Sequence, residues 1–367
     1  MRSESKSAAR LSRRRFLHLA GGALGAMAVG CTSKTPASEE TALPDYVDGG
    51  SGIPVFRGPY LQREAHIAAF LLPARSETLR SLCDTYFTTP SNSTVKVSPL
   101  GPYVLLLYAE MQIQSLDERD KASGWMQETE VSFWIPVAGQ ANRPAWFLPY
   151  LFVDNPYAIA SGREVYGFPK MWGQFEKPER IQNPEFAVDV WGFAEFDPQA
   201  EGKPLRLLES HPTDAAHATP PETWTSWDAA RSALIRQVFK HWQPQANADG
   251  GVPWGETLEA MPLLFLKQFR DAADSRKACY QAIIKAPLRI TTFHGGGFVD
   301  TTYTLTFQPL ASHPLPETLG LNVDTAGVTQ AIATFWLHVD FTLDAGVEVW
   351  RGTSRPYETI VNSGSTS

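Results

Sequence analysis

The most regular pattern in the chain is an alternation of apolar and polar residues near its C-terminal end. Every odd position from 333 to 343 is apolar, and the positions between them are mostly polar. Tyr303, Leu305 and Phe307 alternate with two threonines in the same way. Because successive side chains of a strand point to opposite faces of a sheet, this period of two predicts strands with one face in the core.

Other segments are almost continuously apolar, which is typical of strands that are buried on both faces. Residues 104–108 and 147–153 are of this kind, and the aromatic-rich residues 131–137 predict a further strand. Strand signals therefore dominate the chain. We expect a mostly β domain of the α+β class, with a strongly curved antiparallel sheet or barrel and a few attached helices.

One helix is predicted between two clear end signals. Asn155 is a favourable N-cap and Pro156 suits the first helical position. Gly167 favours the left-handed conformation that ends a helix, and Pro169 prevents its continuation. Lys170 is therefore expected immediately after the end of a helix.

A second helix is predicted over about 227–242, after a polar stretch at 210–223. We interpret about 200–265 as an insertion within a single domain that spans 53–352. The insertion could cover a pocket or mediate assembly, and its residues do not decide between these roles.

His294 and the three glycines after it resemble the oxyanion loop of lipases, but without a Gly-x-Ser-x-Gly elbow we predict only a tight turn there.

Residues 1–30 have the features of a twin-arginine export signal. Residues 12–17 read SRRRFL, and the apolar run after them is shorter than the roughly 20 residues of a membrane span. The run ends in AVGC, which is typical of a lipoprotein cleavage box with Cys31 as the lipidated residue. Ala28 stands where such boxes usually have Leu, so ordinary signal cleavage stays open. We predict an exported periplasmic or cell-envelope protein, with a tether over 31–52 and a C-terminal tail over 353–367.

Removal of residues 1–30 leaves 26 Lys and Arg against 38 Asp and Glu, a net charge of −12. An acidic chain without basic clusters argues against nucleic acid as a partner, and membrane contact is expected only through a lipid anchor. Cys83 and Cys279 either pair or stay free. The eight histidines show no ligand spacing, so neither a metal site nor a cofactor is predicted.

The most specific signal is residues 153–170, with the sequence VDNPYAIASGREVYGFPK. They resemble the segment of the acetoacetate decarboxylase family in which an Asp-Asn turn leads through Gly-Arg-Glu to an aromatic-Pro-Lys ending. Residues 57–60, followed by Arg63 and Glu64, resemble the family's N-terminal element with a spacing two residues shorter. The order of the family's last strands is followed by residues 283–293, 314–321 and 337–350.

This resemblance implies that Lys170 forms a Schiff base with a keto acid, that Arg63 and Glu130 are active-site residues, and that the protein is a homo-oligomer. There are two departures from the family. The second lysine that follows the Schiff-base lysine is replaced by Met171. The family's glutamate on the preceding strand has only a loosely aligned counterpart, Glu110.

The chemistry explains why these residue types are needed. An amine attacks a ketone only when unprotonated, and a lysine with a pKa of about 10.4 is under about a tenth of a percent neutral at pH 7. Phe168, Met171 and Trp172 are expected to line the substrate pocket, where desolvation favours a neutral amine. Arg63 would bind the substrate carboxylate and Glu130 would move protons.

The expected function is therefore a lyase that decarboxylates a β-keto acid resembling acetoacetate. The same imine also supports aldol, retro-aldol and dehydration steps, and Met171 keeps an aldolase-type or dehydratase-type enzyme open. A catalytically silent protein that binds a small ligand is a further alternative.

Overall fold

The computed structural model describes residues 43–47, 55–139, 143–216, 222–237 and 261–352. The chain divides into two units, 1–48 and 49–367, and the fold below belongs to the second. The predicted export signal, Cys31 and the whole predicted C-terminal tail lie outside the described residues. Within the described ranges, no helix has the length and apolar character needed to cross a membrane.

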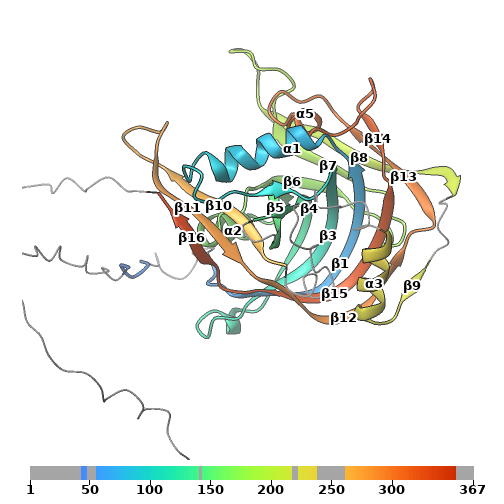
Figure 1. The fold of residues 1–367 in the computed structure, drawn as a ribbon, viewed down its shortest axis with the longest axis horizontal. Coiled ribbons are helices and arrows are strands. Elements are labelled where there is room, and N and C mark those ends of the chain that lie inside the picture. The colour runs from blue at the N-terminus through green and yellow to red at the C-terminus, as the bar shows by residue number, and fades with distance from the viewer. Residues whose placement is uncertain (1–42, 48–54, 140–142, 217–221, 238–260, 353–367) are drawn as a thin grey trace, which may run out of the picture. The chain divides into compact units, whose positions relative to one another are not determined.

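A single curved sheet of 16 strands forms the body of this unit (Figure 1). Its first eight strands are β1 (Tyr60–Pro73), β2 (Ser98–Pro99), β3 (Tyr103–Ser115), β4 (Met126–Ala138), β5 (Pro144–Val153), β6 (Lys170–Glu176), β7 (Ala187–Gly192) and β8 (Lys203–Ala216). The others are β9 (Thr223–Trp224), β10 (Leu263–Arg270), β11 (Ala278–Ala286), β12 (Leu288–Phe298), β13 (Thr301–Phe307), β14 (Val328–Gln330), β15 (Ala333–Leu343) and β16 (Val347–Arg351).

The main strand order is β14-β13-β8-β7-β6-β5-β4-β3-β1-β15-β12-β9. Neighbours along this order are antiparallel except β5 and β6, and β10 also joins β5 in parallel. The α-helices are α1 (Ser76–Cys83), α2 (Pro156–Val165), α3 (Trp227–Gln237) and α5 (Leu315–Leu319), with a π-helical turn at Asp84–Thr88 and a 3-10 turn at Lys121–Ser123. The prediction of a mostly β domain with few helices is confirmed.

The central strands separate two hydrophobic cores. Along β1, Phe70 and its alternate neighbours pack into the first core, whereas Leu71 and its alternate neighbours pack into the second. Strands β3 and β15 divide their side chains between the same two sides. This double burial explains why residues 104–108 are apolar without a break, because both faces of that strand must be covered.

The described residues bear on three local expectations, of which the predicted turn after His294 was wrong. Residues 203–216 of the expected insertion form β8, an integral strand between β7 and β13. The three glycines after His294 lie inside β12 and do not form a turn. An added Cβ at Gly297 would come within 2.5 Å of the Glu222 carbonyl oxygen, so the glycines permit close approach of β9. Cys83 and Cys279 are both free, the first buried and the second exposed.

The crossover from β5 through α2 to β6 determines where Lys170 lies. Asn155 caps α2 as predicted, since its side-chain oxygen accepts hydrogen bonds from the backbone N–H groups of Tyr157 and Ala158. Gly167 ends the helix with a φ of +87°, a left-handed conformation that favours glycine. Lys170 then begins β6, paired in parallel with Leu151 of β5.

We expect Gly167→Ala to destabilise the protein more than Gly139→Ala. An added Cβ at Gly167 would meet the Lys267 Cα at 2.5 Å in addition to its positive φ, whereas at Gly139 the nearest atom is 3.8 Å away. Strain and overpacking together should cost about 2–5 kcal/mol at Gly167 and almost nothing at Gly139. Urea denaturation of both variants measures this, and equal losses would contradict the packing described.

Candidate functional site

A cavity opens on the second-core side of the sheet, between α2 and the strands β1, β3, β4, β5, β6, β10, β12 and β15. Its volume, counted as space open to the centres of water molecules, is about 90 Å³, whereas one water needs about 10–15 Å³ on that measure. The cavity therefore has room for a small organic molecule. Its apolar lining residues include Phe56, Met111, Ile113, Trp125, Met126, Trp134, Leu148, Leu151, Phe168, Leu263, Leu288, Phe341 and Leu343.

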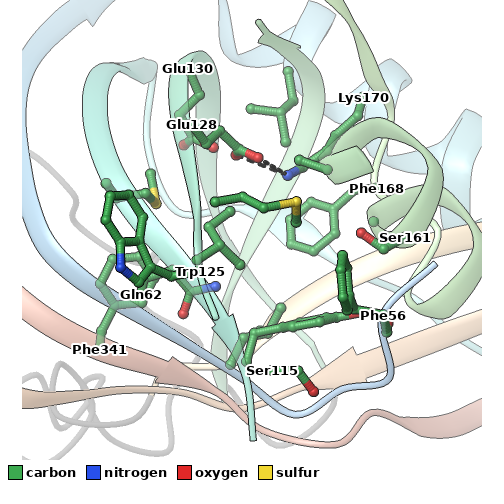
Figure 2. A pocket seen from close by; sticks show the side chains of 18 of the residues that line it. Phe56, Gln62, Ser115, Trp125, Glu128, Glu130, Ser161, Phe168, Lys170 and Phe341 are labelled. Carbon is green, nitrogen blue, oxygen red and sulfur yellow. Dashed lines mark hydrogen bonds and ion pairs between the residues drawn. The ribbon is translucent and has the colours of Figure 1, made fainter. Parts of the chain in front are cut away.

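Lys170 projects into this cavity from the first position of β6 (Figure 2). Its side chain is only 8% exposed. The aliphatic stem lies against Gly162 of α2, where an added Cβ would come within 2.9 Å of the lysine Cδ. The Arg163 guanidinium donates a 3.2 Å hydrogen bond to the Lys170 backbone carbonyl. The Gly-Arg pair of the helix therefore makes room for the lysine and positions its backbone.

Glu128 of β4 is the ion-pair partner of Lys170. The lysine Nζ lies 2.9 Å from one carboxylate oxygen of Glu128 and 3.0 Å from the other. Glu128 is 1% exposed, so the whole pair is removed from bulk water. Figure 2 shows the two side chains pointing toward one another across the cavity wall.

Glu130 follows on the same face of β4 and also lines the cavity. Burial, and after it the negative charge of Glu128, raise the pKa of Glu130 to about 8, although the Lys170 ammonium acts in the opposite direction. Ser132, two residues on, donates a 3.2 Å hydrogen bond to the Glu130 carboxyl group. Glu130 is therefore protonated at neutral pH and is placed to act as an acid.

The three groups form a proton-exchanging set inside an apolar cavity. Glu128 can accept a proton from the Lys170 ammonium directly through either of its oxygens. Glu130 holds a second proton that can be delivered to a bound molecule. This arrangement can generate a neutral amine beside a proton donor, which are the two requirements for imine formation with a carbonyl compound.

The predicted pocket residues divide between the two faces of β6. Phe168 lines the cavity, with the Lys170 Nζ 5.5 Å from its ring centroid. Met171 points to the other side, where it packs against the first core. Trp172 is not among the lining residues, and its ring lies 6.3 Å from that of Trp191. A residue at position 171 therefore faces away from the Lys170 amine, because neighbours on a strand alternate.

Arg63 is also placed differently from the expectation. Its side chain is exposed and does not line the cavity, whereas Gln62 beside it is buried and does. The pairing of β1 with β15 shifts register between Gln62 and Ala65. This β-bulge decides which side chain of the segment turns inward, and the sequence motif alone did not reveal it.

Glu128 was not predicted from the sequence. The glutamate sought on the preceding strand was Glu110, but Glu110 lies outside the cavity, on β3, and pairs with Lys177 at 2.9 Å. Glu128 and Glu130 are two residues apart on β4, which begins before the predicted strand at 131–137, so they share a face. That spacing was the signal that could have identified Glu128 beside Glu130.

Comparisons with known proteins agree with this arrangement at the level of the fold. Residues 51–192 match the family model described as acetoacetate decarboxylase, and this range includes Arg63, Glu128, Glu130 and Lys170. No curated protein matches the chain in sequence.

Two solved structures share the curved sheet with few helices. Acetoacetate decarboxylase from Legionella pneumophila subsp. pneumophila str. Philadelphia 1 is 15% identical, with 85% of this chain and 94% of that chain covered at a TM-score of 0.54. Another acetoacetate decarboxylase structure is 16% identical, with 81% of this chain and 92% of that chain covered at a TM-score of 0.53. The fold is therefore of the acetoacetate decarboxylase type, and at these identities the likeness concerns the fold alone.

We expect Lys170 and Glu128 to be strongly coupled in stability. Lys170→Met and Glu128→Gln should each cost about 3–5 kcal/mol, because each leaves a buried charge without its partner. The double variant should cost less than the sum of the two by about 1–3 kcal/mol. Urea denaturation of the four proteins measures the coupling.

The pair Lys177–Glu110 is a matched control, since its atoms are also 2.9 Å apart but its side chains are 41% and 29% exposed. Its coupling should stay below about 1 kcal/mol. Additive losses at Lys170 and Glu128 would contradict the buried ion pair.

We also expect the stability of Glu130→Gln relative to the wild type to depend on pH. The pKa of Glu130 rises from 4.5 to about 8 on folding. Between these values the unfolded chain has released a proton that the folded chain still holds, so the wild type loses stability as pH rises. The free energy of unfolding of the variant should therefore increase relative to that of the wild type from about pH 4.5 to about pH 8, and the difference should be constant above that pH. Thermal denaturation across this range measures it, and a pH-independent difference would refute the raised pKa.

Proposed function

We propose that this protein is an enzyme of the acetoacetate decarboxylase superfamily in which Lys170 forms a Schiff base with a carbonyl substrate. The observation that carries the proposal is the placement of the Lys170 Nζ in an apolar cavity, 2.9 Å from the Glu128 carboxylate and beside a protonated Glu130. The family match over residues 51–192 and the shared fold support it.

The first step is imine formation. Glu128 takes a proton from Lys170, and the neutral amine attacks the substrate carbonyl to give a carbinolamine. Loss of water, with a proton supplied by Glu130, gives a protonated imine. Glu128 and Lys170 are both close enough to Glu130 to act on its pKa. A proton can therefore be redistributed among the three groups without reaching bulk water.

We propose that the next step is decarboxylation of a β-keto acid. The carbon–carboxylate bond breaks, CO₂ leaves, and the electron pair moves to the imine nitrogen to give an enamine. This step converts a cation and an anion into a neutral molecule. An apolar cavity stabilises the neutral product relative to the charged reactant, so it favours the loss of CO₂.

Glu130 is the best candidate to protonate the enamine carbon, after it has regained from Glu128 the proton that it gave to the leaving water. Burial keeps its carboxyl group protonated up to about pH 8, so it can donate at neutral pH and accept the proton back later. Hydrolysis of the resulting imine releases the ketone and restores the Lys170 amine. Activity should accordingly decline as pH rises through the pKa of Glu130.

One observation favours a different reaction of the same imine. Among the described residues that line the cavity, Lys170 is the sole lysine or arginine, because Arg63 lies outside. A carboxylate substrate would therefore lack a guanidinium partner, and a carbonyl compound without a carboxylate would fit equally well. Aldol, retro-aldol or dehydration chemistry is the second candidate. The presence of Met171 no longer bears on this choice, since its side chain packs on the other face of β6.

We expect sodium borohydride to trap a covalent adduct on Lys170 when the protein is incubated with a panel of keto acids and simple ketones. Mass spectrometry of peptides locates the adduct, and release of CO₂ from the keto acids separates decarboxylation from aldol-type chemistry. Lys170→Arg should abolish both trapping and turnover, because a guanidinium does not form the imine.

The control is Lys267→Arg. Lys267 is a half-buried lysine near the same helix, where its Nζ donates to the Val165 carbonyl, but it does not line the cavity. Trapping at Lys170 should be unchanged in this variant. Wild-type turnover in Lys170→Arg, or trapping only at Lys267, would refute the proposal, and no adduct with any compound would favour a silent binding protein.

A further inference from the structure

A second group of chemically active side chains lies on the opposite face of the sheet from the Lys170 cavity. His66 on β1, His338 on β15 and His294 on β12 come from three neighbouring strands. Glu64 and Asp340 accompany them. On β1, His66 shares its face with Ala68 and Phe70 of the first core, whereas Gln62 lines the Lys170 cavity in the second. The two groups are therefore separated by the thickness of the sheet.

These five side chains are close enough to act together. Glu64, His66 and His338 each offer one ligand atom, and these atoms lie within 4.8 Å of one another, as do those of Glu64, His294 and Asp340. The His338 Nε2 lies 2.9 Å from a Glu64 carboxylate oxygen. The rings of His66 and His338 are stacked with centroids 4.1 Å apart, and that of His294 is 4.4 Å from His338.

The backbone of Glu64 is held in an unusual conformation at this point. Its φ is +48°, in the left-handed region that non-glycine residues rarely adopt. The Asp340 carboxylate accepts a 2.8 Å hydrogen bond from the Glu64 N–H and also contacts the His294 Nε2 at 3.1 Å. Such strain persists where the surrounding structure enforces it and is concentrated at functional sites. Here it directs the Glu64 side chain toward His338.

The surroundings favour a cation. A groove of about 550 Å³, counted as space open to the centres of water molecules, borders the cluster. Its lining includes three carboxylates, those of Glu64, Glu110 and Glu179, and one cationic side chain, Arg180. The side chains of Glu64, His294 and His338 are 48%, 30% and 25% exposed. An ion from solution can therefore reach the ligand atoms without any opening of the fold.

We propose that Glu64, His66 and His338 bind one divalent transition-metal ion, with Zn²⁺ as the best match. Imidazole nitrogen and carboxylate oxygen are ligands that Zn²⁺ takes at about 2.0–2.2 Å, and two ligands of one tetrahedral ion are about 3.4 Å apart. The 2.9 Å between His338 and Glu64 is close to that value already. Since the atoms of the set lie within 4.8 Å, closure by at most about 1.4 Å completes it, with water in the remaining position.

Asp340 and His294 lie next to the three proposed ligands and are not ligands of the ion themselves. Asp340 holds the Glu64 backbone, as a hydrogen-bonding partner behind a metal ligand commonly does. The spacing of the histidines along the chain predicted no such site, because the two histidine ligands come from separate strands that only the sheet brings together. This site does not depend on the proposed function of Lys170.

The test is a Zn²⁺ titration of the full chain after removal of bound metal with a chelator, followed with a competing metal indicator. We expect one ion per chain, and binding weakened about tenfold or more in His338→Asn and in Glu64→Gln. Ca²⁺ should not compete, because it prefers oxygen ligands. Zn²⁺ should also raise the melting temperature of the wild type and leave that of His338→Asn unchanged.

His211→Asn is the matched control, because this surface histidine also lies between two carboxylates, 3.1 Å from Glu185 and 3.6 Å from Glu209. The His211→Asn variant should bind Zn²⁺ with the affinity of the wild type. Circular dichroism establishes that each variant is folded, and borohydride trapping at Lys170 should be the same in all of them. Absence of Zn²⁺ binding, or equal binding in the wild type, His338→Asn and Glu64→Gln, would overturn the site.

Discussion

The buried contact between Lys170 and Glu128 imposes the strongest constraint on this structure. Two opposite charges are held away from bulk water, and their desolvation costs several kcal/mol for each ion. Their mutual attraction offsets that cost only if the geometry is held closely. The structure supplies this through both partners, because Glu128 lies on a central strand and Lys170 follows a capped helix whose glycine accommodates its stem. Burial is also the main cause of the raised pKa of Glu130, and the neighbouring negative charge of Glu128 adds to it.

Much of the architecture could be predicted from the sequence because local rules apply to it. Alternation located β15, continuous apolar runs located strands between two cores, and Asn155 and Gly167 marked the ends of α2. The polar stretch before α3 misled, since its first part is a strand of the sheet. One of its two partners, β13, is distant in sequence, and pairing of this kind leaves only a weak local signal.

The site was predictable only in part, for the same reason. Lys170 and Glu130 belong to recognisable sequence segments, and both reach the cavity. Arg63 and Gln62 could not be distinguished, because a bulge determines which of two adjacent residues turns inward. Met171 seemed chemically important by proximity along the chain, but alternation on β6 turns it to the other core. The group around His338 has no sequence signal, since its three histidines lie on three different strands.

The bulge in β1 also affects how the chain tolerates change. Its extra length displaces the pairing with β15 between Gln62 and Ala65 and the pairing with β3 between Arg63 and His66. Gln62 faces one core and His66 the other. Deletion or insertion of a single residue between them would therefore turn either Gln62 or His66 to the opposite face of the sheet. Point substitutions there alter one side chain, whereas a change of length would disturb two distant surfaces at once. In evolution or engineering, this segment should therefore tolerate substitutions better than insertions or deletions.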